Sequence, residues 1–181
     1  MNNPFELKII RHHWVKDDGI NDREDLCSHG VLFIRIGKEI LSDENTGSWC
    51  TTAAGLHLMR TLYADYDPGD YAGQLIPCCG HFIIPNVDGI RADVHGCFTG
   101  IDWIVNHDEG MVELITESGI KTTIPLEDYK KVILEFANSV ETFYGNPKLK
   151  VLPEDELEKN GFELFWNEWH SLKVSLFKNL A

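Results

Sequence analysis

Three short stretches of the chain carry a cysteine and a histidine two residues apart. They are Cys27-Ser28-His29, Cys79-Gly80-His81 and His95-Gly96-Cys97. Thiolate and imidazole are the ligands that zinc prefers, and a structural zinc site needs four ligands in a tetrahedron. Because residues i and i+2 of a strand share one face, each stretch would present a ligand pair if it were extended. Two such strands side by side would form a zinc-binding domain or a metal-dependent enzyme.

The same residues have a simpler interpretation as parts of the core. None of the three stretches has the Cys-x-x-Cys or His-x-x-x-His spacing of dependable zinc sites. The cysteines are odd in number and sparse, which argues against a disulfide framework and favours small buried side chains; they are Cys27, Cys50, Cys78, Cys79 and Cys97. With 43% hydrophobic residues the chain has material for a core without a metal. We therefore expect no cofactor, and zinc is the alternative.

Catalytic motifs are absent from the sequence. It contains neither a glycine-rich phosphate-binding loop nor a Gly-x-Ser-x-Gly nucleophile elbow. Cys78 or Cys79 beside a histidine would make a thiolate nucleophile, because a nearby imidazolium lowers the pKa of a thiol. The apolar run HFII at 81–84 favours buried and inert thiols instead. We expect a protein without catalytic activity.

Charge is the unusual bulk property of this chain. Its 181 residues include 29 Asp and Glu against 16 Lys and Arg, a formal net charge of −13. Such a surface repels nucleic-acid phosphates and anionic lipid, so we expect neither as a partner. It attracts a basic protein and accelerates the encounter. Acidity also serves solubility alone, and the net charge does not separate these two explanations.

Two acidic segments, 17–25 and 64–71, are the expected contact surface for a basic partner. Carboxylates pair with arginine or lysine across an interface, and tyrosine adds large, rigid contact area. The candidate residues are Asp17, Asp18, Asp22, Glu24, Asp25, Asp65, Tyr66, Asp67, Asp70 and Tyr71. For either segment the alternative is a solvated loop without a partner.

The first two-thirds of the chain reads as strands around one early helix. Alternating or β-branched apolar residues predict strands at 5–15 and 30–37. Segment 50–66 has helical spacing, and Thr51 or Thr52 is expected to cap its start. From 75 to 124, short apolar runs alternate with turn compositions such as NVDG and ESG, which predicts an antiparallel meander.

The last third of the chain reads as two amphipathic helices. They are expected at 125–145 and 161–180, where apolar residues recur at helical spacing. We expect the aromatic stripe of the second helix to pack on the protein's own core, with a homodimer contact as the alternative. Strands followed by helices, rather than strict alternation, indicate an α+β fold. Residues 1–181 are expected to form a single domain built on a largely antiparallel sheet.

The sequence offers no segment suited to a membrane. No apolar run approaches the ~20 residues that span a bilayer. The first residues, MNNPFELKIIRHHW, lack the basic start and long apolar centre of a signal peptide. We therefore expect a cytoplasmic protein.

Four features stand out over the whole chain: the acidity, the acidic and aromatic segment DYDPGDY, and the closing segments DYKKVILEFANSVETFY and ELFWNEW. With these features the chain resembles the immunity proteins of bacterial polymorphic-toxin and contact-dependent growth inhibition systems. The resemblance implies a protein that binds the toxin domain encoded by its neighbouring gene and blocks the active site. Many such toxins are nucleases with basic clefts, which would explain the acidity. The resemblance assigns no site residue and leaves the oligomeric state open.

Overall fold

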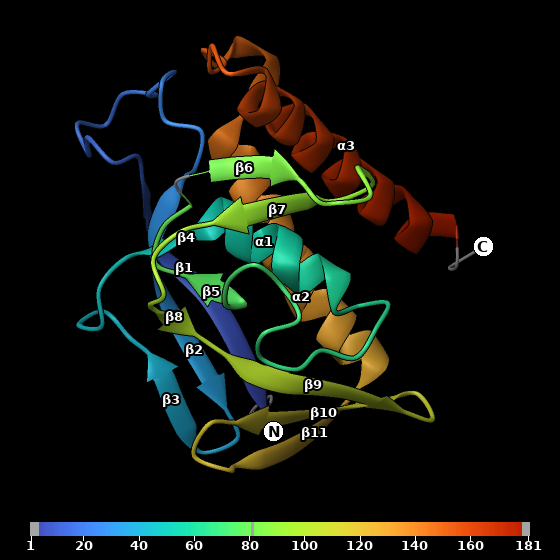
Figure 1. Ribbon diagram of the computed structural model, residues 1–181. Coiled ribbons are helices and arrows are strands. Elements are labelled where there is room, and N and C mark those ends of the chain that lie inside the picture. Colours follow the sequence, from blue (N-terminus) through green and yellow to red (C-terminus); the bar gives the residue numbers. More distant parts are fainter. Residues whose placement is uncertain (1–3, 81, 179–181) are drawn as a thin grey trace.

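The amino-terminal strands form an antiparallel sheet in the computed structural model, which describes residues 4–80 and 82–178 (Figure 1). Its strands are β1 (Phe5–His13), β2 (His29–Ile36), β3 (Glu39–Ser42) and β4 (Trp49–Cys50). Burial alternates along β2, so that Leu32, Ile34 and Ile36 enter the core while their neighbours face outwards. The strands expected at 5–15 and 30–37 are confirmed.

Helix α1 (Thr51–Arg60) lies at the centre of the molecule, where all ten of its residues are buried (Figure 1). It packs against β2, β4, α2 and α3. The helix is shorter than the sequence predicted. After Arg60 the backbone bonds tighten to a spacing of three residues, from Leu62 N to Met59 O at 3.2 Å and from Tyr63 N to Arg60 O at 3.1 Å, and this tight turn closes the helix.

The start of α1 also differs from the prediction that Thr51 or Thr52 caps it. Cys50 occupies the capping position, and no side-chain hydrogen bond is made there. Both threonine hydroxyls instead bind Ser28, with Thr52 Oγ1 accepting from the Ser28 backbone N–H at 2.8 Å. The helix start is therefore tied to the segment that leads into β2, a contact that propensity alone does not reveal.

The middle of the chain forms short antiparallel strands. They are β5 (Ile76–Pro77), β6 (Phe82–Pro85), β7 (Ala92–His95), β8 (Gly100–Ile101), β9 (Trp103–Asp108), β10 (Met111–Thr116) and β11 (Lys121–Pro125). The expected meander divides into separate ladders, β5 with β8, β6 with β7, and β9 with β10 and β11. Pro77 and Pro85 end the first strand of two of these ladders, since proline has no N–H for a further ladder bond.

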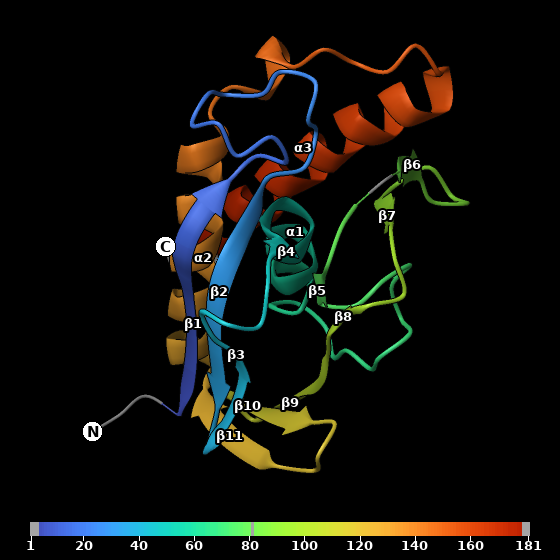
Figure 2. The ribbon, with the colours of Figure 1, turned by 90° about the vertical axis from the view of Figure 1, so that its left-hand side faces the viewer.

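Two long helices complete the α+β fold that the sequence predicted. Helix α2 (Leu126–Tyr144) runs along β1 and ends at Gly145, whose φ of 73° suits glycine (Figure 2). A 3-10 turn, η1 (Pro147–Leu149), precedes α3 (Glu156–Lys178). Helix α3 begins five residues earlier than expected, because the Asp155 carboxylate accepts from the first free backbone N–H groups.

The aromatic stripe of α3 packs into the protein's own core, as predicted. Its buried members are Phe162, Phe165, Trp166 and Trp169. The ring of Trp169 lies so close to Gly55 in α1 that a Cβ there would come within 2.5 Å of it. Helix α3 also packs against β6 and β7 (Figure 1). One buried apolar cluster thus joins both ends of the chain.

His57, inside α1, makes the fold sensitive to acid. Its side chain is fully buried, its Nδ1 donates to Gln74 O at 2.8 Å, and burial beside Arg60 lowers its pKa to about 3. Burial likewise lowers the pKa of His12 to about 4. At pH values between the pKa of histidine in the unfolded chain and the lower pKa values in the folded protein, only the unfolded chain binds the protons. The free energy of unfolding therefore decreases as the pH falls.

We therefore expect the free energy of unfolding to fall between about pH 6.5 and about pH 3. The share of His57 over this whole range is on the order of 5 kcal/mol, because each pKa unit corresponds to about 1.4 kcal/mol. Urea unfolding at several pH values checks this, with His57→Asn as the variant, since its amide keeps a donor near Gln74. The variant is expected to show a shallower pH dependence. An identical slope in both proteins would contradict the assignment.

Candidate functional site

Cysteines gather where a long antiparallel pairing is interrupted. The β5–β8 ladder pairs Ile76 with Ile101, and the β6–β7 ladder pairs Phe82 with His95, in one continuous register. Between the ladders, residues 78–80 face residues 97–99 without regular strand pairing. One backbone bond remains there, from Cys78 N to Thr99 O at 3.1 Å. The register therefore places Cys78 opposite Thr99 and Gly80 opposite Cys97, which brings Cys78 and Cys79 close to Cys97.

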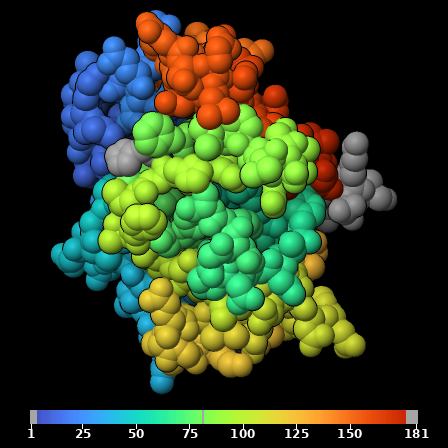
Figure 3. All heavy atoms as spheres, in the orientation of Figure 1, coloured from blue at the N-terminus to red at the C-terminus, as the bar shows by residue number. Residues whose placement is uncertain are grey.

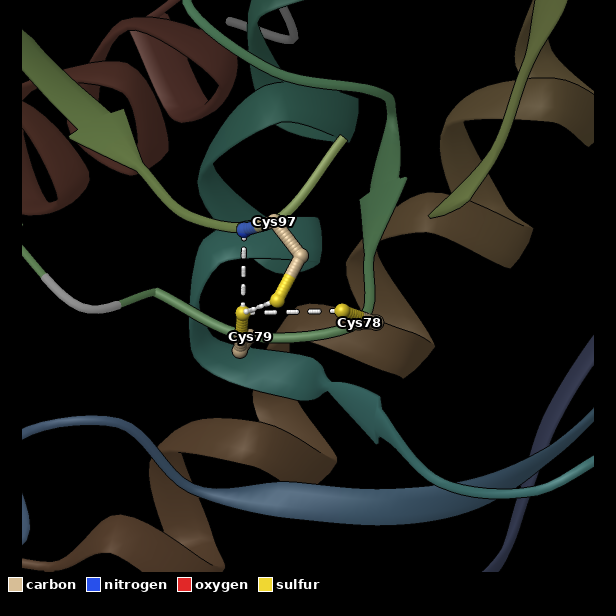
Figure 4. Close-up of side chains that lie close together, drawn as sticks. All are labelled: Cys78, Cys79 and Cys97. Atoms are coloured by element: carbon tan, nitrogen blue, oxygen red, sulfur yellow. Dashed lines mark hydrogen bonds between the residues drawn. The ribbon is translucent and has the colours of Figure 1, made fainter. Parts of the chain in front are cut away.

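The side chains of Cys78, Cys79 and Cys97 point toward one another in this gap (Figure 4). We call them the cysteine cluster. Their sulfur atoms lie within 4.8 Å of one another, with Cys79 Sγ 2.8 Å from Cys97 Sγ and 3.5 Å from Cys78 Sγ. The backbone N–H of Cys97 donates to Cys79 Sγ at 3.1 Å, and the Thr99 hydroxyl lies 3.4 Å from Cys78 Sγ. Cysteines from two segments thus meet at one point.

Two glycines allow the segments of the cysteine cluster to approach each other. A Cβ at Gly96 would lie 2.2 Å from the Cys79 carbonyl oxygen, and one at Gly80 would lie 2.9 Å from Val94 and 3.0 Å from Cys27 Sγ. Neither position has room for a larger residue, which explains the glycine beside a cysteine in both segments.

The thiols of the cluster differ in acidity. Burial raises the pKa of Cys79 to about 12, and its hydrogen bond with the Cys97 thiol adds to the rise. For Cys78, burial also raises the pKa, but hydrogen bonds with Thr99, Cys97 and Cys79 outweigh it and the pKa lies below the usual value. Cys78 is therefore the thiol that gives up its proton more readily, which suits a metal ligand or a nucleophile.

The other residues of the expected zinc site lie elsewhere or outside the described residues. Cys27 is buried next to Cys50, and their hydrogen bond, with burial, holds the pKa of Cys27 well above its usual value. His29 Nδ1 lies 3.9 Å from an oxygen of Asp25. His95 is exposed on β7, and the described residues that cluster as ligands do not include it. His81 lies outside the described residues.

Among the described residues, the structure brings Cys79 and Cys97 of the expected site together and does not group Cys27, His29 or His95 with them. Zinc binding itself stays a prediction. The expected site also omitted Cys78, which the sequence suggested only as a nucleophile. The sequence analysis lacked the pairing of the strands. When β5 pairs with β8 and β6 pairs with β7, Cys78 and Cys79 lie near Cys97, although these residues are far apart along the chain.

Most carboxylates of the acidic segment 17–25 are bound to groups of the same protein. Arg11 pairs with Asp17 at 2.5 Å, and Lys16 pairs with Asp22 and Glu24. Asp18 accepts from Ile20 N. These bonds fix the shape of the loop, and they reduce what the segment offers to a partner.

Asp22 and Asp25 are corrections to the predicted contact surface. Their side chains are only 8% and 12% exposed, and Asp25 accepts from the backbone N–H groups of Val15 and Cys27. The buried Lys150 binds this loop from its inner side. Its Nζ lies 3.3 Å from the centre of the Trp14 ring and donates to Asp22 O, and burial lowers its pKa to about 8.

The acidic segment 64–71 is divided between core and surface. Tyr66 is 1% exposed, its hydroxyl donates to Asp102, and its backbone bridges to Val105. The Tyr66 ring is therefore not available to a partner, which corrects the prediction. Tyr71 is half-buried against it, with ring centres 4.7 Å apart. The carboxylates of this segment, in contrast, face outwards.

A second acidic turn lies beside this segment. Asp65 accepts from the backbone N–H and Nδ1 of His107, at 2.8 and 2.9 Å, which brings the β9–β10 turn alongside. Together the two turns expose five carboxylates, which we call the acidic patch: Asp65, Asp67, Asp70, Asp108 and Glu109. Figure 3 shows both turns on the face toward the viewer. The contribution of the β9–β10 turn was missed, since 65 and 107 are far apart in the sequence.

A hollow of about 440 Å³ adjoins the acidic patch. Its lining includes Tyr63, Asp70 and Tyr71, together with the ion pair of Arg60 and Glu168. Because Asp65 and Asp70 of the acidic patch line the hollow, a long side chain of a partner has space beside these carboxylates.

Comparisons of the chain with known proteins give no relative to reason from. No family model, curated protein or solved structure matches it. Within residues 4–80 and 82–178, the helices are all too short or too polar to cross a bilayer.

Proposed function

We propose that this chain is a binding protein that neutralises a basic toxin domain, such as a nuclease, by covering its substrate cleft. The acidic patch is the observation that carries the proposal. Carboxylates from two distant segments are held on one surface by the Asp65–His107 contact. This is the role that the resemblance to immunity proteins implies.

The charges around the acidic patch support this role. Among the described residues, His107 is the basic side chain that is ion-paired to the patch. Other lysines and arginines are paired with carboxylates elsewhere, as in Lys8–Glu6, Lys130–Glu127 and Lys173–Glu141. Arg91 lines the adjoining hollow together with Asp65 and Asp70. One arginine beside five carboxylates leaves the patch negative, and a partner with arginines or lysines would supply the remaining counterions.

The mechanism follows from competition for the same positive groups. A nuclease cleft holds phosphates with lysine and arginine, and carboxylates at similar spacing would occupy those positions and exclude the nucleic acid. Long-range attraction would accelerate the encounter, and dissolved salt would weaken it. Tyr63, which is 42% exposed, would add apolar contact next to the carboxylates.

The proposal is tested by expressing this chain in bacteria together with the toxin domain encoded by the neighbouring gene. We expect the chain to restore growth and to co-purify with the toxin domain at low ionic strength. A chain that neither protects nor co-purifies would contradict the proposal.

Charge reversal locates the contact surface. The patch variant carries Asp67→Lys, Asp108→Lys and Glu109→Lys, and the matched control carries the same charge change at other exposed sites, as Glu44→Lys, Asp88→Lys and Glu154→Lys. We expect the patch variant to bind the toxin domain at least ~100-fold more weakly and the control to differ by less than ~10-fold. Equal effects of the two variants would overturn the patch as the contact surface.

A further inference from the structure

We propose that Cys78, Cys79 and Cys97 bind a zinc ion through their sulfur atoms, as a structural metal that fastens the β5–β6 segment to the β7–β8 segment. The inference does not depend on the proposed function, because the cysteine cluster and the acidic patch are formed by different parts of the chain.

The positions of the sulfur atoms carry this inference. Zinc–sulfur bonds are about 2.3 Å long, so tetrahedral geometry separates two sulfurs by about 3.8 Å. The Cys78–Cys79 distance of 3.5 Å is already close to this value, and all three sulfurs lie within 4.8 Å of one another. The Cys79–Cys97 distance of 2.8 Å has to open by about 1 Å. Cys97 is exposed, so its side chain has room to rotate away from Cys79.

The surroundings of the cysteine cluster are those of a built site. The regular ladder stops on both sides of it, which frees residues 78–80 and 97–99 to turn their thiols toward one another. The N–H of Cys97 donates to Cys79 Sγ, and such bonds to a ligand atom orient it and stabilise its charged form. Gly96 permits the close approach of the two segments, with a Cβ excluded by the Cys79 carbonyl.

A disulfide between Cys79 and Cys97 is the competing explanation for their short distance. It would leave the third thiol, Cys78, without a role in the cluster, whereas a metal site uses all three. Binding zinc converts each thiol to a thiolate and releases its proton to solvent. The described residues supply three of the four ligands of a tetrahedral site, so the coordination shell should contain three sulfurs.

The test uses the full chain, produced without an affinity tag and with zinc in the medium. We expect elemental analysis to find about one zinc per chain, and the denatured protein to contain five titratable thiols. Replacing zinc by cobalt(II) should produce cobalt–thiolate charge-transfer absorption, and X-ray absorption should count three sulfurs. Metal-free protein, or three thiols with one Cys79–Cys97 disulfide, would overturn the inference. These measurements use the unchanged chain, so they do not require any variant to fold.

Variants then assign the ligands. Cys79→Ser and Cys97→Ser should each reduce the zinc affinity at least ~10-fold and lower the melting temperature. Cys50→Ala is the matched control, because it removes a buried thiol outside the cysteine cluster and should leave the zinc content unchanged. Zinc lost equally in all three variants would contradict the assignment. Binding of the toxin domain is measured in a separate experiment. A failure of the zinc proposal can then be distinguished from a failure of the proposed function.

Discussion

Gly161→Ala is expected to destabilise the protein by at least ~3 kcal/mol, whereas the same change inside a helix normally stabilises by about 1 kcal/mol. Gly161 lies in α3 against β6, and a Cβ there would come within 2.0 Å of Ile83 O and 2.5 Å of Ile84 Cα. Both are backbone atoms, so no side chain can move aside. Helix α3 would have to lift from the strand, withdrawing Phe162 and its buried neighbours from the core.

Urea unfolding followed by circular dichroism measures this effect. Asn160→Ala is the control, because it adds alanine at the adjacent, exposed position of the same helix. We expect the control to stay within ~0.5 kcal/mol of the unchanged protein. A Gly161→Ala variant as stable as the control would show that α3 does not lie against the backbone of β6.

Glu168→Gln is expected to cost about 3–5 kcal/mol, because it leaves the charge of Arg60 buried without its partner. Glu168 accepts two hydrogen bonds from Arg60, at 2.8 and 2.9 Å, and a third from Ala92 N at 3.0 Å. The two side chains are 8% and 10% exposed. Because Arg60 also donates to Ala92 O, this pair connects α1, α3 and β7.

A double variant separates the ion pair from the surrounding packing. Replacing both Arg60 and Glu168 by methionine should cost less than Glu168→Gln alone, since no unpaired charge is left behind. Glu127→Gln is the surface control: Glu127 is 68% exposed beside Lys130, and its loss should cost less than ~1 kcal/mol. Equal effects of the buried and surface changes would contradict the role of burial.

Local patterns in the sequence predicted the elements of the fold and its α+β class. The apolar spacing along 125–145 and the alternation along 30–37 depend on near neighbours, and both elements formed where expected. The expected cap of α1 and the expected start of α3 were wrong where an unrecognised polar group decided them. Ser28 binds the threonines at the start of α1, and Asp155 begins α3 before Gly161.

The sites were harder to predict, because they join segments that are distant in the sequence. The cysteine cluster depends on the register of β5 with β8, and the acidic patch depends on Asp65 reaching His107. Tyr66 seemed suited to an interface by composition, but its bridge to Val105 turns the ring into the core. The residue types indicated metal binding by thiols and charge pairing by carboxylates. The pairing between distant segments decided which of these residues lie together.

The most direct test of the proposed function is the rate of association with the toxin domain from the neighbouring gene, measured by stopped flow at increasing salt. If the acidic patch steers the encounter, the rate constant should fall at least ~10-fold between about 0.05 and 0.5 M ionic strength. The Asp67, Asp108 and Glu109 charge-reversal variant should associate slowly at all salt concentrations. An association rate that is independent of salt and unchanged in this variant would contradict the account.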